Sequence, residues 1–361
     1  MNGTLVGCWA SGIPQIKERL GLDEGTLGLA LLAFAFGSIV AMLFGGPRID
    51  HFGSRLVLLI STLGFSFSLP LVLLAQSLPQ LLAAVVVIGF ANGLMDVSMN
   101  AQGITVERRR DRPIMSSLHA FFSIGGMTGA AAAALSYGLG GGIEHYLLTV
   151  CVLVIPPAVF ALHGLFPDAQ AAGLKGRILA LPPRSLWLIA AFTCIAFVCE
   201  GAMFDWGAVY LRDALGSDAS TAALGFGTFS AAMAAGRLLG DRVVARTSRV
   251  TILRGSAVIA CLGYVLALAG ESIVLTFFGY ALIGLGVANI VPVLFSLAGT
   301  RKEIGHGSGI AAVATAGYSG SLLGPAWVGF LADLFSLRWA LAVTAVFLVL
   351  LVCFGRLVRK D

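Results

Sequence analysis

The stretch TLGLALLAFAFGSIVAMLFGGP, residues 26–47, contains no charged side chain, and RIDHFGSR separates it from a second such stretch at 56–75. An α-helix rises about 1.5 Å per residue, so about 20 apolar residues cross the ~30 Å hydrocarbon core of a bilayer. Similar blocks recur along the 361 residues, the mean hydropathy is +0.94, and only 11% of the residues are charged. Soluble domains carry roughly 25% charged residues. The sequence therefore predicts an all-α protein that crosses a membrane many times.

The apolar blocks predict eleven full spans and one partial span at the start of the chain. The full spans are predicted at 26–47, 56–75, 80–104, 113–137, 146–166, 186–211, 219–240, 251–269, 273–297, 308–332 and 337–356. Residues 1–14 would reach only about 20 Å as a helix. We therefore expect a twelve-span fold with its first helix truncated, and roughly 10–20 natural residues before Met1. A genuine half-helix is the alternative, and N-terminal sequencing of the native protein separates the two.

Basic residues mark alternate connectors. If the connector after 26–47 faces the cytoplasm, 19 of the 23 Lys and Arg residues lie on that side. The exceptions are Lys17, Arg19, Arg212 and Arg338. Because Lys and Arg are enriched in cytoplasmic loops, the sequence predicts a multi-pass protein of a bacterial inner membrane with both termini cytoplasmic. The net charge of +5 fits the anionic cytoplasmic leaflet and requires no nucleic acid.

The longest polar break, 167–185, divides the predicted spans into two sets of six. We predict an N-terminal six-helix bundle (1–166), a cytoplasmic linker (167–185) and a C-terminal six-helix bundle (186–361). Short matches indicate a repeat, since Gly89-Phe90-Ala91-Asn92 in the first set corresponds to Gly286-Val287-Ala288-Asn289 in the second. Repeated helical units are typical of secondary transporters, which bind substrate near the bilayer midplane between the repeats.

The segment Gly46-Pro47-Arg48-Ile49-Asp50-His51-Phe52-Gly53-Ser54-Arg55 joins the second and third spans. It resembles the loop signature of the major facilitator superfamily, which is a Gly, an Asp four residues later, then basic residues around a second Gly. The span number and the 6+6 repeat extend this resemblance over the whole chain. Trp9–Pro14 and Glu200–Trp206 are similar to bacterial permeases near the fucose-permease-like group.

This resemblance implies a secondary active transporter that moves a small solute, sugar-like or another metabolite, by proton-coupled alternating access. It also implies a gating loop in which Asp50 locks the cytoplasmic side against the eleventh span. The residues of that predicted loop are Gly46, Asp50, His51, Gly53 and Arg55.

Several departures from the family pattern leave alternatives open. His51 and Ser54 stand where basic residues are usual, and the fourth span lacks the arginine of many proton-driven exporters. Ser123–Gly129 in the fifth span lacks the Gly-Pro pair of drug antiporters. A drug or metabolite exporter that works as a proton antiporter is the alternative within the family. A non-transporting membrane sensor is the alternative of another class, and uptake into proteoliposomes separates it from a transporter.

Polar residues inside the spans are the candidates for function, because a charge at the bilayer centre costs at least about 2.5–3.5 kcal/mol on insertion scales. Asn92, Asp96 and Asn100 are spaced by four residues and therefore share one face of the fourth span. We predict that they contact substrate or protons. His119 enters the fifth span at a similar depth, so Asp96 and His119 are predicted to form a proton relay. Structural hydrogen bonds between helices are the alternative for each residue.

The seventh span contains Glu200, Asp205 and Trp206. We take Glu200 as a lone carboxylate near mid-bilayer and as the first candidate for the proton-coupling group, because an unpaired charge there is costly. Trp206, and Trp9 at the equivalent position of the first span, are expected either to stack on a ligand or to anchor at the membrane interface. Asp205 is placed with them in the substrate or proton pathway.

Asn289 in the tenth span is the repeat partner of Asn92, and Pro292 follows it by about one turn. A proline removes one backbone hydrogen bond, and broken helices are tolerated at this depth where they line a cavity. Asn289 is therefore a further predicted ligand contact, and the backbone is predicted to break near it.

The remaining predictions concern partners and chemistry. The six cysteines form no CxxC pair and are expected to be free, with no metal site. The sequence lacks HExxH and GxSxG motifs, so it predicts no enzyme and no cofactor. The predicted partners are a small-molecule substrate, protons and the lipid bilayer, and the protein is predicted to be a monomer.

Overall fold

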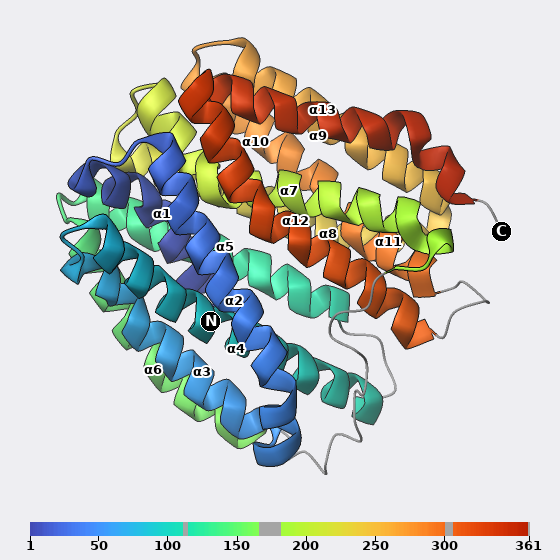
Figure 1. Ribbon diagram of the computed structural model, residues 1–361, viewed down its shortest axis with the longest axis horizontal. Helices are drawn as coiled ribbons and strands as arrows, with labels where there is room; N and C mark the ends of the chain where they lie inside the picture. Colours follow the sequence, from blue (N-terminus) through green and yellow to red (C-terminus); the bar gives the residue numbers. More distant parts are fainter. Residues whose placement is uncertain (111–114, 166–181, 300–305, 360–361) are drawn as a thin grey trace.

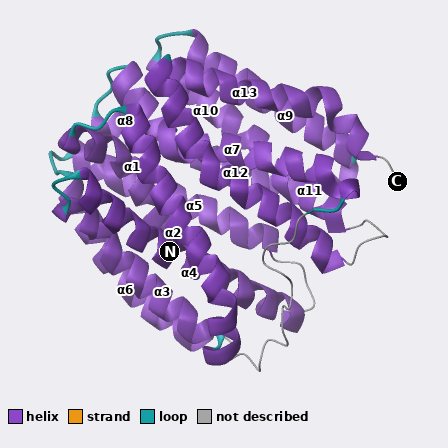
Figure 2. Cartoon of the chain, in the orientation of Figure 1, coloured by secondary structure: helices purple, strands orange, loops and turns teal. Residues whose placement is uncertain are grey.

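The computed structural model describes residues 1–110, 115–165, 182–299 and 306–359 (Figure 1). Within these ranges the regular secondary structure consists of helices, which short loops and turns connect (Figure 2). The α-helices are α1 (Asn2–Leu20), α2 (Glu24–Phe52), α3 (Ser54–Ser68), α4 (Leu78–Arg110), α5 (Met115–Gly138), α6 (Ile143–Gly164), α7 (Trp187–Val209), α8 (Ala219–Arg246), α9 (Arg249–Ala269), α10 (Ile273–Val287), α11 (Ile290–Gly299), α12 (His306–Leu334) and α13 (Leu337–Phe354). Four short helical turns are η1 (Leu69–Leu74), η2 (Arg184–Leu186), η3 (Tyr210–Ala214) and η4 (Gly355–Arg359), of which η3 is π-helical.

Ten helical segments in the described ranges are long and apolar enough to cross a membrane, and each coincides with a predicted span. α12 covers the predicted eleventh span. The tenth span is broken as Pro292 predicted, since α10 ends at Val287 and α11 starts at Ile290. All six cysteines lie in the described ranges and are free. Most of the predicted linker, residues 166–181, lies outside the described residues.

The first helix is longer than predicted. α1 has 19 residues and continues past Pro14 through a polar stretch to Leu20. The prediction placed the end of this helix at residue 14 because the apolar residues become sparse there, but the polar residues that follow are also helical. The helix ends instead at Gly21, whose φ of +60° is a left-handed conformation that glycine adopts without strain.

The predicted gating loop is mostly helical. α2 continues to Phe52 and α3 begins at Ser54, so Gly53 alone makes the turn, with a φ of +80° that favours glycine. His51 lies in the last turn of α2, and Arg55 lies in the first turn of α3. The prediction that residues 48–55 connect the two spans as a loop was wrong because a single positive-φ glycine is enough to separate the two helices.

The helices form two groups with the same internal pairing. In α1–α6, α2 packs on α4, α1 on α5, α3 on α4 and α3 on α6. In α7–α13, α8 packs on α10, α7 on α12, α9 on α10 and α9 on α13. If α10 and α11 count as one span, these are equivalent pairs. The pairing is what a duplicated six-helix unit would produce.

Small residues allow the helices within a group to approach closely. A Cβ at Gly7 would clash with the carbonyl oxygen of Gly126, and one at Gly89 would clash with the carbonyl oxygen of Phe34. A Cβ at Gly263 would lie 2.7 Å from the carbonyl oxygen of Gly279. These contacts are tighter than real Cβ atoms show, so glycine is required where backbones meet. Such close packing supports helix association in lipid, where burial of apolar surface gives little driving force.

The two groups meet along two helix pairs, α5 with α8 and α2 with α12. The Ser220 hydroxyl donates to the carbonyl oxygen of Ala134 at 2.9 Å, and a Cβ at Gly28 would lie 3.1 Å from the Cα of Gly329. Both contacts lie toward the end of the bundle where α1 ends and α2 begins, which we call the closed end. Toward the other end the axes of the two groups diverge (Figure 1).

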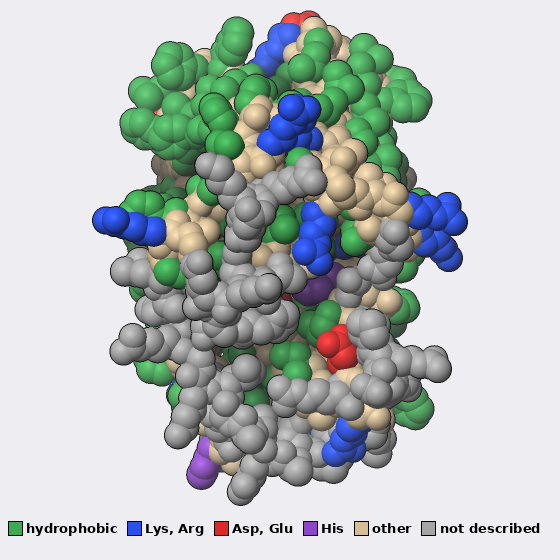
Figure 3. Space-filling view, turned by 90° about the vertical axis from the view of Figure 1, so that its right-hand side faces the viewer, with side chains coloured by type: hydrophobic (Ala, Val, Ile, Leu, Met, Phe, Trp, Pro, Cys, Tyr) green, Lys and Arg blue, Asp and Glu red, His purple; other side chains and the backbone are tan. Residues whose placement is uncertain are grey.

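The diverging end carries most of the basic connectors, and we call it the basic end. The chain turns there at Gly53 and between α8 and α9, and α4 and α13 also terminate there. Lys and Arg side chains are spread over the described part of this face, flanked by hydrophobic side chains (Figure 3). The distribution is that expected for a helical bundle with one basic membrane surface.

At the closed end, side-chain caps start the helices. Asp23 accepts a hydrogen bond from the backbone amide of Thr26 at 2.7 Å, and Asp218 accepts one from Thr221 at 2.9 Å. These hydrogen bonds hold the pKa of both aspartates below its usual value. The caps satisfy amides that the first turns of α2 and α8 leave free.

Candidate functional site

An arginine joins the two helix groups at mid-depth. Arg237 of α8 donates from Nη2 to Oε1 of Glu200 on α7 at 3.0 Å, and from Nη1 to the Ser123 hydroxyl on α5 at 2.8 Å. Nη1 also lies 3.3 Å from the carbonyl oxygen of His119. The side chains of Arg237 and Glu200 are only 11% and 16% exposed. We call Arg237, Glu200 and Ser123 the Arg237 bridge.

The bridge corrects one prediction. Glu200 is not a lone carboxylate, because Arg237 neutralises its charge. Arg237 reaches it from a different helix, 37 residues further along the chain. A guanidinium carries several donors in a fixed plane, so one side chain can hold an acid and two acceptors at once.

A second polar contact between the groups involves Asp96. Its carboxylate accepts hydrogen bonds from the Tyr318 hydroxyl on α12 and from the Asn100 side chain on its own helix. The Asn100 amide also donates to the Asp96 carbonyl oxygen at 2.9 Å. The Tyr318 ring lies 5.8 Å from that of Phe197 on α7. Asp96 and Asn100 therefore lie together, as their spacing predicted.

The predicted relay between Asp96 and His119 is not formed. Asp96 takes its hydrogen bonds from Tyr318 and Asn100, whereas the imidazole of His119 is exposed and its backbone carbonyl faces Arg237. Similar depth on adjacent helices did not bring the two side chains together, because α4 and α5 face different neighbours. Each packs mainly on another helix, α4 on α2 and α5 on α1 and α8.

Asn92 belongs to a hydrogen-bond network within the N-terminal group. Its amide lies 3.5 Å from the Ser38 hydroxyl on α2, and its carbonyl oxygen lies 3.5 Å from the amide of Asn2 on α1. Ser38 donates in turn to the carbonyl oxygen of Gly89 at 2.8 Å. The network connects α1, α2 and α4. Asn92 therefore makes the structural hydrogen bonds between helices that were the alternative to substrate contact.

Asn289 is directed at α8. Its amide donates to the carbonyl oxygen of Gly236 at 3.0 Å, one residue before Arg237. A Cβ at Gly240 would clash with the side-chain oxygen of Asn289, so the Asn289 side chain packs directly against the glycine. The break between α10 and α11 thus places Asn289 where it fixes the helix that carries the Arg237 bridge.

The two tryptophans are buried, which contradicts the prediction of interfacial anchors. Trp9 is 5% exposed and stacks on Phe34, with ring centroids 5.4 Å apart and an interplanar angle of 7°. Trp206 is 0% exposed and lies against the position of Gly329. Because neither ring has a free face of any size, both are packing residues in this conformation and not ligand platforms.

Aromatic side chains join the groups on the closed-end side of the bridge. The Phe122 ring on α5 lies 6.2 Å from the Phe204 ring on α7, and Phe204 also contacts Phe226 and Phe229 on α8. Asp205, next to Phe204, is partly exposed and has no hydrogen-bond or ion-pair partner among the residues that the structure describes. It is thereby distinguished from Asp96 and Glu200.

Charged residues also join the groups at the closed end. Lys17 at the end of α1 forms ion pairs with Asp213 of η3 at 2.5 Å and with Glu24 at 3.0 Å. Glu18 pairs with Arg212 at 3.1 Å. Burial alone would lower the pKa of Lys17, but its hydrogen bonds to the two acids outweigh this and raise the pKa above its usual value. We call these five residues the ion-pair clasp.

Comparison with known proteins identifies the family. The profile described as Major Facilitator Superfamily matches residues 1–316. The chain belongs to the major facilitator superfamily. It is 33% identical to an MFS-type transporter of Yersinia pestis, over 99% of this chain and 93% of that protein. It is also 31% identical to the membrane protein MosC of Rhizobium meliloti, over 98% of this chain and 86% of the relative.

Solved structures of superfamily members have the same fold. The nucleoside transporter NupG superimposes with a TM-score of 0.77 at 13% identity, over 100% of this chain and 96% of NupG. A bacterial homologue of the lysosomal transporter Spinster, in an inward-facing and unoccupied conformation, gives a TM-score of 0.74 at 16% identity, over 99% and 94% of the two chains. The family match and the MFS-type relative, together with this fold, show that the chain is a membrane transporter of a small solute and not an enzyme.

The sequence analysis missed Arg237, Ser123 and Tyr318 as site residues. Arg237 carried a usable signal, because a basic residue inside a span needs an acidic partner. Ser123 and Tyr318 carried none, since hydroxyl side chains are common in membrane helices and hydrogen-bond locally in many of them.

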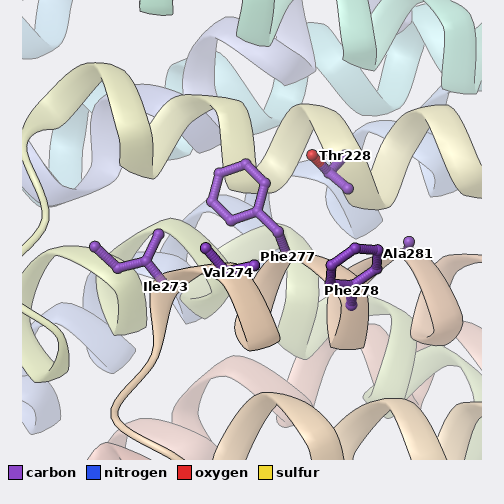
Figure 4. Close-up of a pocket in the computed structure, with 6 residues that line it drawn as sticks. All are labelled: Thr228, Ile273, Val274, Phe277, Phe278 and Ala281. Atoms are coloured by element: carbon purple, nitrogen blue, oxygen red, sulfur yellow. The ribbon is translucent and has the colours of Figure 1, made fainter.

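An apolar groove lies apart from this polar centre, between α8 and α10 (Figure 4). Its volume is about 410 Å³, and its lining consists of Thr228, Ile273, Val274, Phe277, Phe278 and Ala281. The Thr228 hydroxyl donates to the carbonyl oxygen of Leu224 at 2.9 Å, so it presents no free donor to the groove. The groove therefore offers no recognition of a polar solute.

Proposed function

We propose that the protein is a proton-coupled symporter that moves a small metabolite, sugar-like or similar, across a bacterial inner membrane by alternating access. We further propose that residues 1–166 and 186–361 are its two moving bundles, and that the basic end faces the cytoplasm. The observation that carries this proposal is the Arg237 bridge, which connects an acid of one bundle to a hydroxyl of the other at mid-depth.

The bridge supports proton coupling because its strength depends on one proton. Ionised Glu200 holds the guanidinium of Arg237 in place, 2.8 Å from Ser123 in the other bundle. A proton on Glu200 removes the ion pair and leaves a partly buried cation without its counter-charge, which is unfavourable. Proton uptake therefore favours a rearrangement of α8 relative to α5, and the substrate site lies beside that contact.

The shape of the molecule supports the rest of the proposal. α5 with α8 and α2 with α12 close the bundle at the clasp, and the helix axes diverge toward the basic end (Figure 1). In the proposed orientation this is a conformation open to the cytoplasm. Asn92, Asn100, His119, Asp205 and Asn289 complete the proposed pathway, and Asp50 remains the proposed cytoplasmic gate.

The test begins with a ligand. A thermal-shift screen of the purified protein against sugars, organic acids and amines identifies a solute, and proteoliposomes then report its uptake. Glu200→Gln keeps the shape and hydrogen bonding of the side chain but removes its titration. We expect this variant to lose proton-driven accumulation and to keep counterflow, which moves no net proton. Accumulation with a normal pH dependence in Glu200→Gln would disprove coupling at the bridge.

The orientation has its own test. A reporter fused after Asp361 should be active only if it functions in the cytoplasm, because 18 of the 23 Lys and Arg residues lie on the proposed cytoplasmic side when Arg237, which lies inside the bundle, is left out of the 19. Activity of a periplasm-specific reporter at that position would reverse the proposed orientation.

A further inference from the structure

Asp205 differs from the other embedded acids. Arg237 neutralises Glu200, and Tyr318 and Asn100 hydrogen-bond Asp96. Asp205 has neither kind of partner in the described part of the chain, although its side chain is only partly exposed. Burying an ionised carboxylate without a partner inside a membrane protein costs free energy. Such residues therefore face a cavity or pair with another group.

The helix surface beside Asp205 is open. Gly201 lies one turn earlier on the same face of α7. A Cβ built on Gly201 would have a single neighbour within 4 Å, the Oδ2 atom of Asp205 at 4.0 Å. By contrast, a Cβ at Gly320 of α12 would lie 2.5 Å from the carbonyl oxygen of Cys194, about two turns earlier on α7, and one at Gly324 would lie 3.5 Å from the Cα of Val198. A free carboxylate oxygen therefore borders unfilled space inside the bundle.

We propose that Asp205 and the open surface over Gly201 form a subsite for a protonated primary amine of the transported solute. This rests on the proposed transport function and narrows its substrate class to small solutes that carry an ammonium group. Asp205 supplies the counter-charge, and the missing side chain at Gly201 leaves room for the ammonium to approach Oδ2.

Charge favours an amine over a neutral hydroxyl at this position. Hydroxyl groups can satisfy the lone pairs of a carboxylate, but they leave its charge without compensation in a region of low dielectric. An ammonium supplies both the hydrogen bonds and the opposite charge. The described ionisable side chains of the central region, apart from His119, are Asp96, Glu200, Asp205 and Arg237, so acids outnumber the base.

Accessibility of a thiol at residue 201 tests the subsite without knowledge of the solute. The Gly201→Cys protein in detergent is reacted with a methanethiosulfonate that carries either a trimethylammonium or a sulfonate group. Peptide mass spectrometry then quantifies each adduct at residue 201 relative to the adduct at the exposed Cys353. We expect the cationic reagent to react about tenfold faster at the introduced thiol after this normalisation, because Asp205 attracts it. Adding Asp205→Asn should abolish the preference. No labelling, or an unchanged preference with Asp205→Asn, would overturn the proposal.

A minimal ligand gives the second measurement. Ethylammonium chloride should slow the reaction of the introduced thiol with neutral methyl methanethiosulfonate, whereas sodium chloride at the same ionic strength should not. Gly255→Cys is the matched control, because a Cβ there has nothing within 4 Å and the residue is exposed on α9. Equal effects of the two salts at residue 201, or protection at residue 255 as well, would overturn the subsite. Neither measurement uses a proton gradient, so their outcome is independent of coupling through Glu200.

Discussion

The two helix groups are joined by charge in two places that differ in design. In the ion-pair clasp, Lys17 of α1 pairs with Asp213 of η3 and with Glu24, and Glu18 pairs with Arg212 of η3. Two separate ion pairs therefore cross between the groups. In the Arg237 bridge, one cation serves an acid of its own group and acceptors of the other. The clasp keeps one ion pair between the groups when any one of its residues is neutralised, whereas neutralising Arg237 removes every contact of the bridge. The difference indicates that the clasp keeps the two groups together at the closed end, whereas the contact made by the bridge can form and break.

The surroundings lead to the same distinction. In the clasp Lys17 is 14% exposed, but its partners Glu24 and Asp213 are 28% and 31% exposed and Glu18 is 64% exposed. Both partners in the bridge are buried, since Arg237 and Glu200 are 11% and 16% exposed. Exposed ion pairs contribute about 0–1 kcal/mol each, because water screens them. Removal of one partner from a buried pair costs about 3–5 kcal/mol, since the other charge stays buried and uncompensated. Substitutions at the bridge should therefore have the larger effects.

Arg237→Met is expected to have the largest effect. It leaves Glu200 without its counter-charge and removes the donor to Ser123, so we expect a destabilisation of about 3–5 kcal/mol and loss of transport. Thermal unfolding of the purified protein measures the first effect, and uptake measures the second. The double variant Arg237→Met with Glu200→Gln should recover most of the stability, because neither residue of the ion pair then leaves an uncompensated charge. If the double variant were as unstable as the single one, Arg237 would act by packing and not by charge.

Tyr318→Phe should have an intermediate effect. It removes the hydroxyl that donates to Asp96 and leaves the contact between the Tyr318 and Phe197 rings in place. Loss of one hydrogen bond to a charged group costs about 1.5–3 kcal/mol. Asp96→Asn with Tyr318→Phe should cost less than the sum of the two single changes, and thermal unfolding of the four proteins measures this coupling. Strict additivity would show that the two side chains do not interact.

Much of the fold was predictable because a span satisfies its backbone hydrogen bonds internally and must be apolar over its length. That rule located the helical segments and, through Pro292, the break between α10 and α11. It failed where helices leave the bilayer. The polar end of α1 stays helical to Leu20, and α2 continues through the predicted gating loop to Phe52. Polar residues do not by themselves end a helix, and both helices continue until a glycine with a positive φ, Gly21 or Gly53.

The candidate site was predictable in part. The spacing of Asp96 and Asn100 placed them correctly on one helix face, because that relation is local. The partner of Glu200 was not predictable, since it depends on the register of α8 against α7 and on the packing of both against α5. Depth alone suggested that Asp96 and His119 would pair, but depth does not determine which way a helix faces. Helix rotation is set by tertiary contacts that a single sequence does not reveal.

Variants of the clasp should produce smaller, salt-dependent effects. Asp213→Lys places two like charges together, and Lys17→Asp in the same protein restores opposite charges, although Glu24 then faces an acid. We expect the single variant to lose about 1 kcal/mol and the double variant to regain part of it, with both differences reduced in about 1 M salt. Cross-linking of cysteines placed on α2 and α12 near Gly28 and Gly329 reports closure of this end. A single variant that cross-links as fully as wild type would show that small-residue packing alone closes it.

The smallest expected effect concerns the caps that position the clasp end of the helices. Asp218 accepts from the Thr221 amide at 2.9 Å and from its hydroxyl at 2.8 Å, and it is exposed to water. Asp218→Ala should cost about 1 kcal/mol, as other caps do, and Asp218→Asn should cost less because it retains an acceptor.

The pKa of Asp218 is lowered in the folded protein by these hydrogen bonds. Its contribution is therefore complete above the ordinary aspartate pKa of about 3.9 and is lost as the pH falls through the lower folded value. Thermal unfolding at pH 7 and near pH 3 measures this: the difference between wild type and Asp218→Ala should shrink at the acidic pH, whereas a pH-independent difference would show that the carboxylate charge plays no part in starting α8.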